Sequence, residues 1–190
     1  MRGIAKLVGG AALVGAAAAG GGLGLVTGAF TVDVGAGRRT RALGPTEVLI
    51  EAPRELVFDV IAEPYLARPT RALREKVQVW ERGADMVLAA HFTPLAGGRV
   101  RALTVETVRF ERPARVEFRL VRGPVPSVVE SFVLTPHRGG TRLRYEGALS
   151  TDLWSLGQAW GDLVSRRWEA TVAASLASVR VEAARRAARA

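Results

Sequence analysis

Apolar and polar residues alternate with a period of two through most of the chain between residues 75 and 149. This alternation is typical of strands that bury one face. Turn residues rich in glycine, proline and aspartate interrupt it at short intervals. The pattern predicts strands over residues 75–82, 86–93, 99–110, 115–122, 128–136 and 141–149. Because the links are short, consecutive strands should pair antiparallel as a meander.

The residues that flank this region predict one more strand and two helices. A short β-rich run over residues 46–50 precedes Pro53, and proline is favoured in the first turn of a helix. Residues 65–74 are irregular and rich in arginine. After Asp152, which is suited to cap a helix, apolar residues recur at three- or four-residue spacing: Trp160, Val164, Trp168, Val172, Leu176 and Val179. This long helix should cover the apolar face of a seven-stranded antiparallel sheet, which predicts an α+β fold.

The amino-terminal part of the chain is strongly apolar. No charged residue occurs from Leu7 to Phe30, a run that spans about 36 Å as a helix, whereas a hydrocarbon core is about 30 Å thick. We therefore expect a single-pass transmembrane helix within residues 1–30, a tether over residues 31–45 and one globular domain over residues 46–190.

Other interpretations of this segment stay open. Ala17 and Ala19 could form the cleavage site of a signal peptide, and the segment could instead be an Ala/Gly linker. Gly20, Gly24 and Gly28 would form a smooth helical face suited to a homodimer, although such spacing also arises by chance here. Basic residues lie on both sides of the run, so the side of the membrane that the domain occupies is undetermined: Arg2 and Lys6 before it, Arg38, Arg39 and Arg41 after it.

The amino-acid composition excludes several kinds of functional site. The 190-residue chain has no cysteine and two histidines, which excludes disulfides, thiolate metal sites and a cysteine nucleophile. We expect neither a bound metal nor a cofactor. The formal net charge is +9, but the arginines are spread along the chain without a basic stripe interleaved with aromatic residues. This distribution favours contact with anionic lipid headgroups over nucleic-acid binding.

Two stretches resemble the START/Bet v 1-like superfamily, also called the SRPBCC or polyketide cyclase-like group. One is the opening run Val48-Leu49-Ile50-Glu51-Ala52-Pro53-Arg54-Glu55-Leu56-Val57-Phe58, and the other is Gly139-Gly140-Thr141-Arg142-Leu143 before a Trp-rich terminal helix. The resemblance covers about residues 45–182. It implies a helix-grip fold, in which a curved sheet wraps a long carboxy-terminal helix around a cavity for hydrophobic ligands. Members include lipid carriers, plant hormone binders and aromatic-ring cyclases. Most share no catalytic residues, so none is transferred to this chain, and its apolar amino-terminal segment departs from the usual soluble member.

Strand alternation places three charged residues on the otherwise apolar inner face: Glu106, Arg122 and Glu130. If Phe110 pairs with Val116 and Arg122 with Val128, Arg122 lies beside both glutamates. The three side chains would then either anchor the polar end of a ligand or form an ion cluster without a ligand role.

These observations predict a membrane-anchored protein that binds a hydrophobic small molecule or lipid without catalysis. One alternative is a cyclase- or hydratase-like enzyme that uses Glu106 or Glu130 as acid and base. Another is an assembly factor whose cavity has no ligand. The candidate ligand-binding residues are Glu106, Arg122, Glu130, Tyr145, His91, Phe118, Phe132, Trp160 and Val164.

Overall fold

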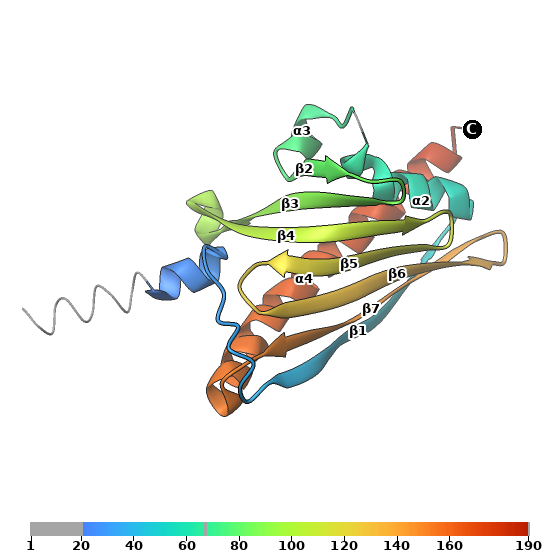
Figure 1. The fold of residues 1–190 in the computed structure, drawn as a ribbon. Helices are drawn as coiled ribbons and strands as arrows, with labels where there is room; N and C mark the ends of the chain where they lie inside the picture. The colour runs from blue at the N-terminus through green and yellow to red at the C-terminus, as the bar shows by residue number, and fades with distance from the viewer. Residues whose placement is uncertain (1–20, 67, 190) are drawn as a thin grey trace, which may run out of the picture.

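A curved antiparallel sheet wraps one side of a long helix in the computed structural model, which describes residues 21–66 and 68–189 (Figure 1). The seven strands lie in the order β1-β7-β6-β5-β4-β3-β2. Their bounds are β1 Arg39–Ile50, β2 Val77–Arg82, β3 Met86–Leu95, β4 Val100–Glu111, β5 Arg115–Arg122, β6 Ser127–His137 and β7 Gly140–Thr151. The helices and helical turns are α2 Arg54–Ala62, η1 Glu63–Tyr65, α3 Arg71–Arg74, η2 Ala96–Gly98 and α4 Trp154–Ala187. The predicted meander and the edge position of the first strand are confirmed.

The first strand is longer than its sequence pattern indicates. It starts at Arg39 and pairs with β7 along its length, with a bulge between Leu43 and Thr46. Gly44 and Pro45 occupy this bulge. Glycine and proline usually mark a turn, but an edge strand tolerates both at a bulge. Part of the segment expected as a tether is therefore strand.

The long helix α4 has 34 residues and crosses the inner face of the sheet, as predicted. It packs chiefly against β1, β7 and α2. Its buried face alternates small and branched residues, which lets the backbone of α4 approach the sheet closely: Gly157, Gly161, Val164, Ser165, Val172, Leu176 and Ala183. Trp160 and Trp168 are half-buried and pack against the same core.

Both ends of α4 are tied to other elements. Near the carboxy-terminal end, Arg186 forms ion pairs of 2.6 Å with Glu63 in η1 and with Glu182. At the other end, Trp160 donates a hydrogen bond of 2.8 Å from Nε1 to the Pro124 carbonyl in the β5–β6 turn. These contacts fix the position of the helix along the sheet.

The described amino-terminal residues fold back on the domain. Residues 21–27 are helical, and the helix stops at Gly28, whose φ of +71° favours glycine. Within the part of the chain that the structure describes, no helix is both long and apolar enough to span a membrane. Residues 1–20 of the expected anchor lie outside the described residues. The glycine face is partly occupied by this chain itself, because Gly24 lies beside the Phe30 ring and Gly28 beside the Leu103 carbonyl, while Gly20 is not described.

Asp152 does not cap α4, contrary to the sequence-based expectation. The capping position belongs to Leu153, which has a positive φ and offers no side-chain cap. The buried carboxylate of Asp152 instead accepts hydrogen bonds of 2.7 Å from the backbone N–H groups of Val34 and Gly35 and from Nε of Arg38. The Arg38 guanidinium and these N–H groups lower the pKa of Asp152 to about 2. A side chain that could have capped the helix thus holds the amino-terminal segment.

The Asp152 contacts predict a pH-dependent loss of stability. Because the pKa is lowered in the folded state, this stabilisation is complete above about pH 4 and is lost as the pH falls toward 2. Asp152→Asn should therefore lower the melting temperature at pH 7 but add little further loss near pH 2. The control Asp33→Asn, at an exposed partner of the same arginine, should have a small effect at both pH values. Thermal unfolding that shows an equal loss from Asp152→Asn at both pH values would contradict this assignment.

Candidate functional site

A row of aromatic rings lines the inner face of the sheet. Phe110, Phe118, Phe132 and Tyr145 come from β4, β5, β6 and β7, and Tyr65 of η1 lies over the first two. The ring centroids of neighbouring pairs lie between 5.4 and 6.3 Å apart. Phe110 and Phe132 remain half-buried after folding. The inner face of the sheet is therefore aromatic, and two of its rings keep part of their surface exposed.

Glu130 lies at one end of this row and is only 7% exposed. Its Oε2 atom accepts hydrogen bonds from the Tyr145 hydroxyl at 2.8 Å and from Nε1 of Trp168 at 2.7 Å. These two donors come from β7 and α4, so one carboxyl oxygen joins the sheet to the helix. The two bonds give Glu130 a structural role that needs no ligand.

Gly147 provides the room that Glu130 needs. The two residues are cross-strand partners on β6 and β7 and share the inner face. A methyl group at position 147 would lie 2.7 Å from the Glu130 Cβ and 2.7 Å from the Val129 carbonyl oxygen. A larger residue there would push the carboxyl away from Tyr145 and Trp168.

Glu106 lies elsewhere on the same face and has a different environment. Its Oε2 atom is 3.3 Å from Nδ1 of His91, and Nε2 of His91 forms a 2.9 Å hydrogen bond with the Tyr65 hydroxyl. His91 Nδ1 is buried but makes no hydrogen bond to the described residues. Glu106, His91 and Tyr65 thus form a buried polar group that is incompletely satisfied, unlike the group around Glu130.

Burial changes the protonation of these side chains. It raises the pKa of Glu106 to about 7, against the effect of the Thr104 side chain. Burial, and then the charge of Glu106, raises the pKa of Glu130 to about 7, although Trp168 and Tyr145 act in the opposite direction. Burial also lowers the pKa of His91 to about 4. Near neutral pH the histidine is therefore neutral, and each carboxyl can hold or release a proton.

Arg122 does not join the two glutamates, so its predicted place on the inner face is wrong. The register shifts at the end of β5: Glu106 faces Leu120, but the next residue, Val105, faces Arg122. Val121 is the extra residue of this bulge, and it turns Arg122 to the other face. Arg122 is exposed and donates a 2.5 Å hydrogen bond from Nη2 to the Ala29 carbonyl.

The assumed pairing was correct on one side of β5 and wrong on the other. Phe110 pairs with Val116, as assumed, and Glu106 lies beside Leu120. Glu130 pairs with Phe118 instead of Leu120, which separates the two acids further along the sheet. Without a nearby arginine, the carboxyls depend on protonation and on neutral hydrogen-bond donors.

The remaining sequence-predicted residues lie around the aromatic row. Tyr145, Phe118 and Val164 are buried, while His91, Phe132 and Trp160 are half-buried. The sequence pattern does not mark Tyr65 as a site residue, and it places Trp168 only among the packing residues of the long helix. Tyr65 lies in a single helical turn after Pro64, where no periodicity marks an inward side chain. Among the described residues, no group of three acids or histidines could hold a metal ion.

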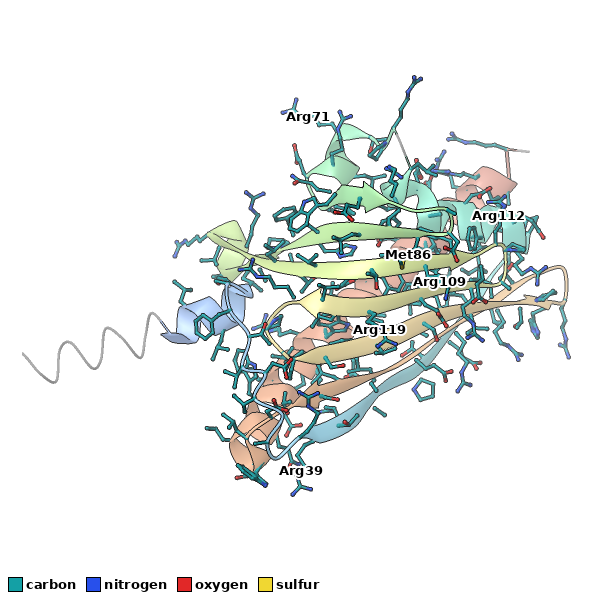
Figure 2. All side chains as sticks on the ribbon, viewed as in Figure 1. Arg39, Arg71, Met86, Arg109, Arg112 and Arg119 are labelled. Atoms are coloured by element: carbon teal, nitrogen blue, oxygen red, sulfur yellow. The ribbon has the colours of Figure 1, made fainter. Side chains whose placement is uncertain are left out.

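Two hollows open at the surface of the domain, and Phe118 and Glu130 are among the residues that line the larger one. One of about 250 Å³ opens beside β1, β7 and the start of α4, and Arg41 and Asp162 line it. The other, of about 600 Å³, is on the outer face of the sheet, from which Met86, Arg109 and Arg119 project away from α4 (Figure 2). Neither hollow reaches the buried polar group of Glu106, His91 and Tyr65.

Comparisons with known proteins identify the fold. No family model matches the chain, and no curated protein matches it. The Zhui aromatase/cyclase from Streptomyces superposes with a TM-score of 0.59 at 17% identity over 78% of this chain and 95% of that one. The Thermus thermophilus protein TTHA0849 gives 0.58 at 18% identity, covering 74% and 94% of the two chains. Norcoclaurine synthase from Thalictrum flavum, solved with dopamine and hydroxybenzaldehyde, gives 0.57 at 11% identity, covering 77% and 87%. The predicted helix-grip fold is confirmed, and identities this low show the fold alone.

The raised pKa values predict that stability falls with rising pH. The folded state holds protons on Glu106 and Glu130 that the unfolded chain releases from about pH 4.5. His91 has the opposite effect below pH 6.5. Its pKa is lowered in the folded state, so folding releases a proton at these pH values and stability rises with pH. The effect of the two glutamates is therefore measured without the opposing effect of His91 between pH 6.5 and about 8. Over this range Glu106 should lower the free energy of unfolding by about 1 kcal/mol.

Glu106→Gln should remove this part of the slope in chemical denaturation measured across the window. Glu117→Gln is a matched control, because Glu117 is a half-exposed glutamate on the neighbouring strand β5 that pairs with Arg115. A Glu106→Gln protein with the wild-type slope would show that Glu106 is already ionised at pH 6.5.

Proposed function

We propose that the domain binds a hydrophobic small molecule or lipid against the aromatic inner face, between the sheet and α4. The observation that carries this proposal is the incompletely satisfied polar group of Glu106, His91 and Tyr65 within an aromatic surface. A ligand with an apolar body and one polar atom would cover the half-buried rings and give His91 or Glu106 a hydrogen-bond partner. The polar atom would be a hydroxyl, carbonyl or carboxylic acid.

An enzyme with acid/base chemistry is the second candidate. Glu106 has a pKa raised to about 7, and it lies beside His91, which is hydrogen-bonded to Tyr65. A carboxylate at Glu106 would take a proton from a bound substrate and return it to another atom of that substrate. Glu130 is less suited to this role, because proton transfer at Oε2 would disrupt its bonds to Tyr145 and Trp168.

Ligand binding predicts that the full chain, purified from its own membrane, carries an apolar compound in native mass spectrometry. Glu106→Gln should weaken retention of that compound about 10- to 100-fold, since a buried hydrogen bond to an ionisable group contributes about 1.5–3 kcal/mol. The matched control Glu117→Gln should retain it as the wild type does. Release of the compound unchanged after long incubation favours binding, and its conversion by wild type but not by Glu106→Gln favours the enzyme. A wild-type chain without any bound compound would favour the assembly factor.

We also propose that the uncharged run from Leu7 to Phe30 attaches the chain to a membrane. The intact chain should stay in the membrane pellet after a high-salt wash, because burial of apolar residues is insensitive to ionic screening. A chain that starts at Thr31 keeps the partners of Asp152 and should be released into the supernatant. Release of the intact, uncleaved chain by salt alone would mean that the attachment is electrostatic.

A further inference from the structure

Exposed apolar side chains occur along the segment that joins the β5–β6 turn to the start of α4. Residues 28–38 run from the β5–β6 turn, where Thr31 donates a hydrogen bond to the Gly123 carbonyl, to the start of α4 (Figure 1). Along this path Phe30 is 45% exposed and Val34 60%. At the start of α4, Trp154 is 57% exposed and Leu156 71%. We call these four residues the apolar end: Phe30, Val34, Trp154 and Leu156.

Arginines flank the apolar end. Arg39 begins β1 directly after this segment and forms no ion pair with any carboxylate of the described residues. Figure 2 shows its side chain pointing away from the sheet at the same end of the molecule. Arg122 reaches the Ala29 carbonyl, close to Phe30. The acids nearest this segment are already engaged, since Asp33 and Asp152 both bind Arg38.

The backbone at the start of α4 holds Trp154 in an unfavourable conformation. Leu153 and Trp154 have φ values of 70° and 49°, in the left-handed region that bulky residues rarely adopt. Hydrogen bonds of 2.8 Å to the Ala36 carbonyl and 3.0 Å to the Gly37 carbonyl maintain this geometry. Backbone strain of this kind persists where the surroundings over-determine it, and it marks candidate functional positions.

We propose that the apolar end lies on the surface of an anionic lipid bilayer, with the Trp154 indole at the level of the headgroups. Tryptophan is enriched at that depth, and arginines beside it pair with lipid phosphates. In the sequence, the uncharged run from Leu7 to Phe30 leads directly into this segment. A second copy of the chain is a poorer partner, because a two-fold contact would bring the same unpaired arginines together.

The test uses the full chain reconstituted into vesicles of phosphatidylcholine with or without phosphatidylglycerol. Some lipids carry bromine, which quenches tryptophans at the bilayer surface. Trp80 is a matched control, because it is 52% exposed but lies on the edge strand β2. Trp154→Asn should abolish most of the quenching, whereas Trp80→Phe should preserve it. Asparagine tolerates a positive φ, so Trp154→Asn should keep or raise the melting temperature, which separates lost contact from lost folding.

A second pair of variants tests whether the positive charge of Arg39 contributes to contact with anionic lipid. Arg39→Glu should reduce quenching several-fold in the anionic vesicles, while Arg71→Glu, on the remote turn α3, should leave it unchanged. The proposal is overturned if Trp154→Asn keeps the wild-type quenching, if anionic lipid makes no difference, or if the chain fails to float with the vesicles. It is equally overturned if sedimentation shows a dimer that Trp154→Asn dissolves.

Discussion

The carboxyl group of Glu130 is the contact on which the relation between sheet and helix depends. A single oxygen accepts one hydrogen bond from β7, through Tyr145, and one from α4, through Trp168. The carboxyl is buried, so loss of one donor would leave Oε2 with a single hydrogen bond, and loss of both would leave a buried acceptor unsatisfied, which destabilises a fold more than the bond itself stabilises it. Gly147 belongs to this arrangement, because any side chain there would occupy the space of Glu130. The contact is consistent with the rotation of α4 that turns Trp168 toward the sheet, a rotation that packing against β1, β7 and α2 also supports.

The same interior contains a second carboxyl with the opposite character. Glu130 is satisfied by neutral donors, whereas Glu106 has only His91 within ion-pair distance among the described residues. Two acids in one aromatic interior cannot both ionise cheaply, and no lysine or arginine of the described residues forms an ion pair with either of them. Protonation of the two carboxyl groups therefore reduces their mutual repulsion, an effect that a neighbouring arginine would have in an ion cluster. This solution keeps the interior apolar when it is protonated and leaves Glu106 able to exchange its proton near neutral pH.

Regular patterns were predictable from the sequence, and single irregular residues were not. Alternation located the strands and the burial of Glu106 and Glu130, because each strand extends the same pattern over many residues. One extra residue, Val121, was enough to invert the face of Arg122, and nothing in the alternation marks it. Gly44 and Pro45 looked like a turn but lie within β1. The contacts of Tyr65 and Asp152 were not predictable for a related reason. Their partners lie far away in sequence, and only the folded chain brings them together.

One helix carries both the strained tryptophan and the donor to Glu130. Trp154 and Trp168 are separated by about 21 Å along α4 at 1.5 Å per residue. Between them the helix is held by Trp160 at the β5–β6 turn and by Gly161, which lies against Thr151 and Leu149 of β7. A helix with close backbone contacts along its length moves as a rigid body, so a shift at its first turn cannot be absorbed locally. Asp152, just before that first turn, binds residues 34–38 by four hydrogen bonds. The amino-terminal segment, the start of α4 and the Glu130 contact are therefore mechanically one unit, although they come from three distant parts of the sequence.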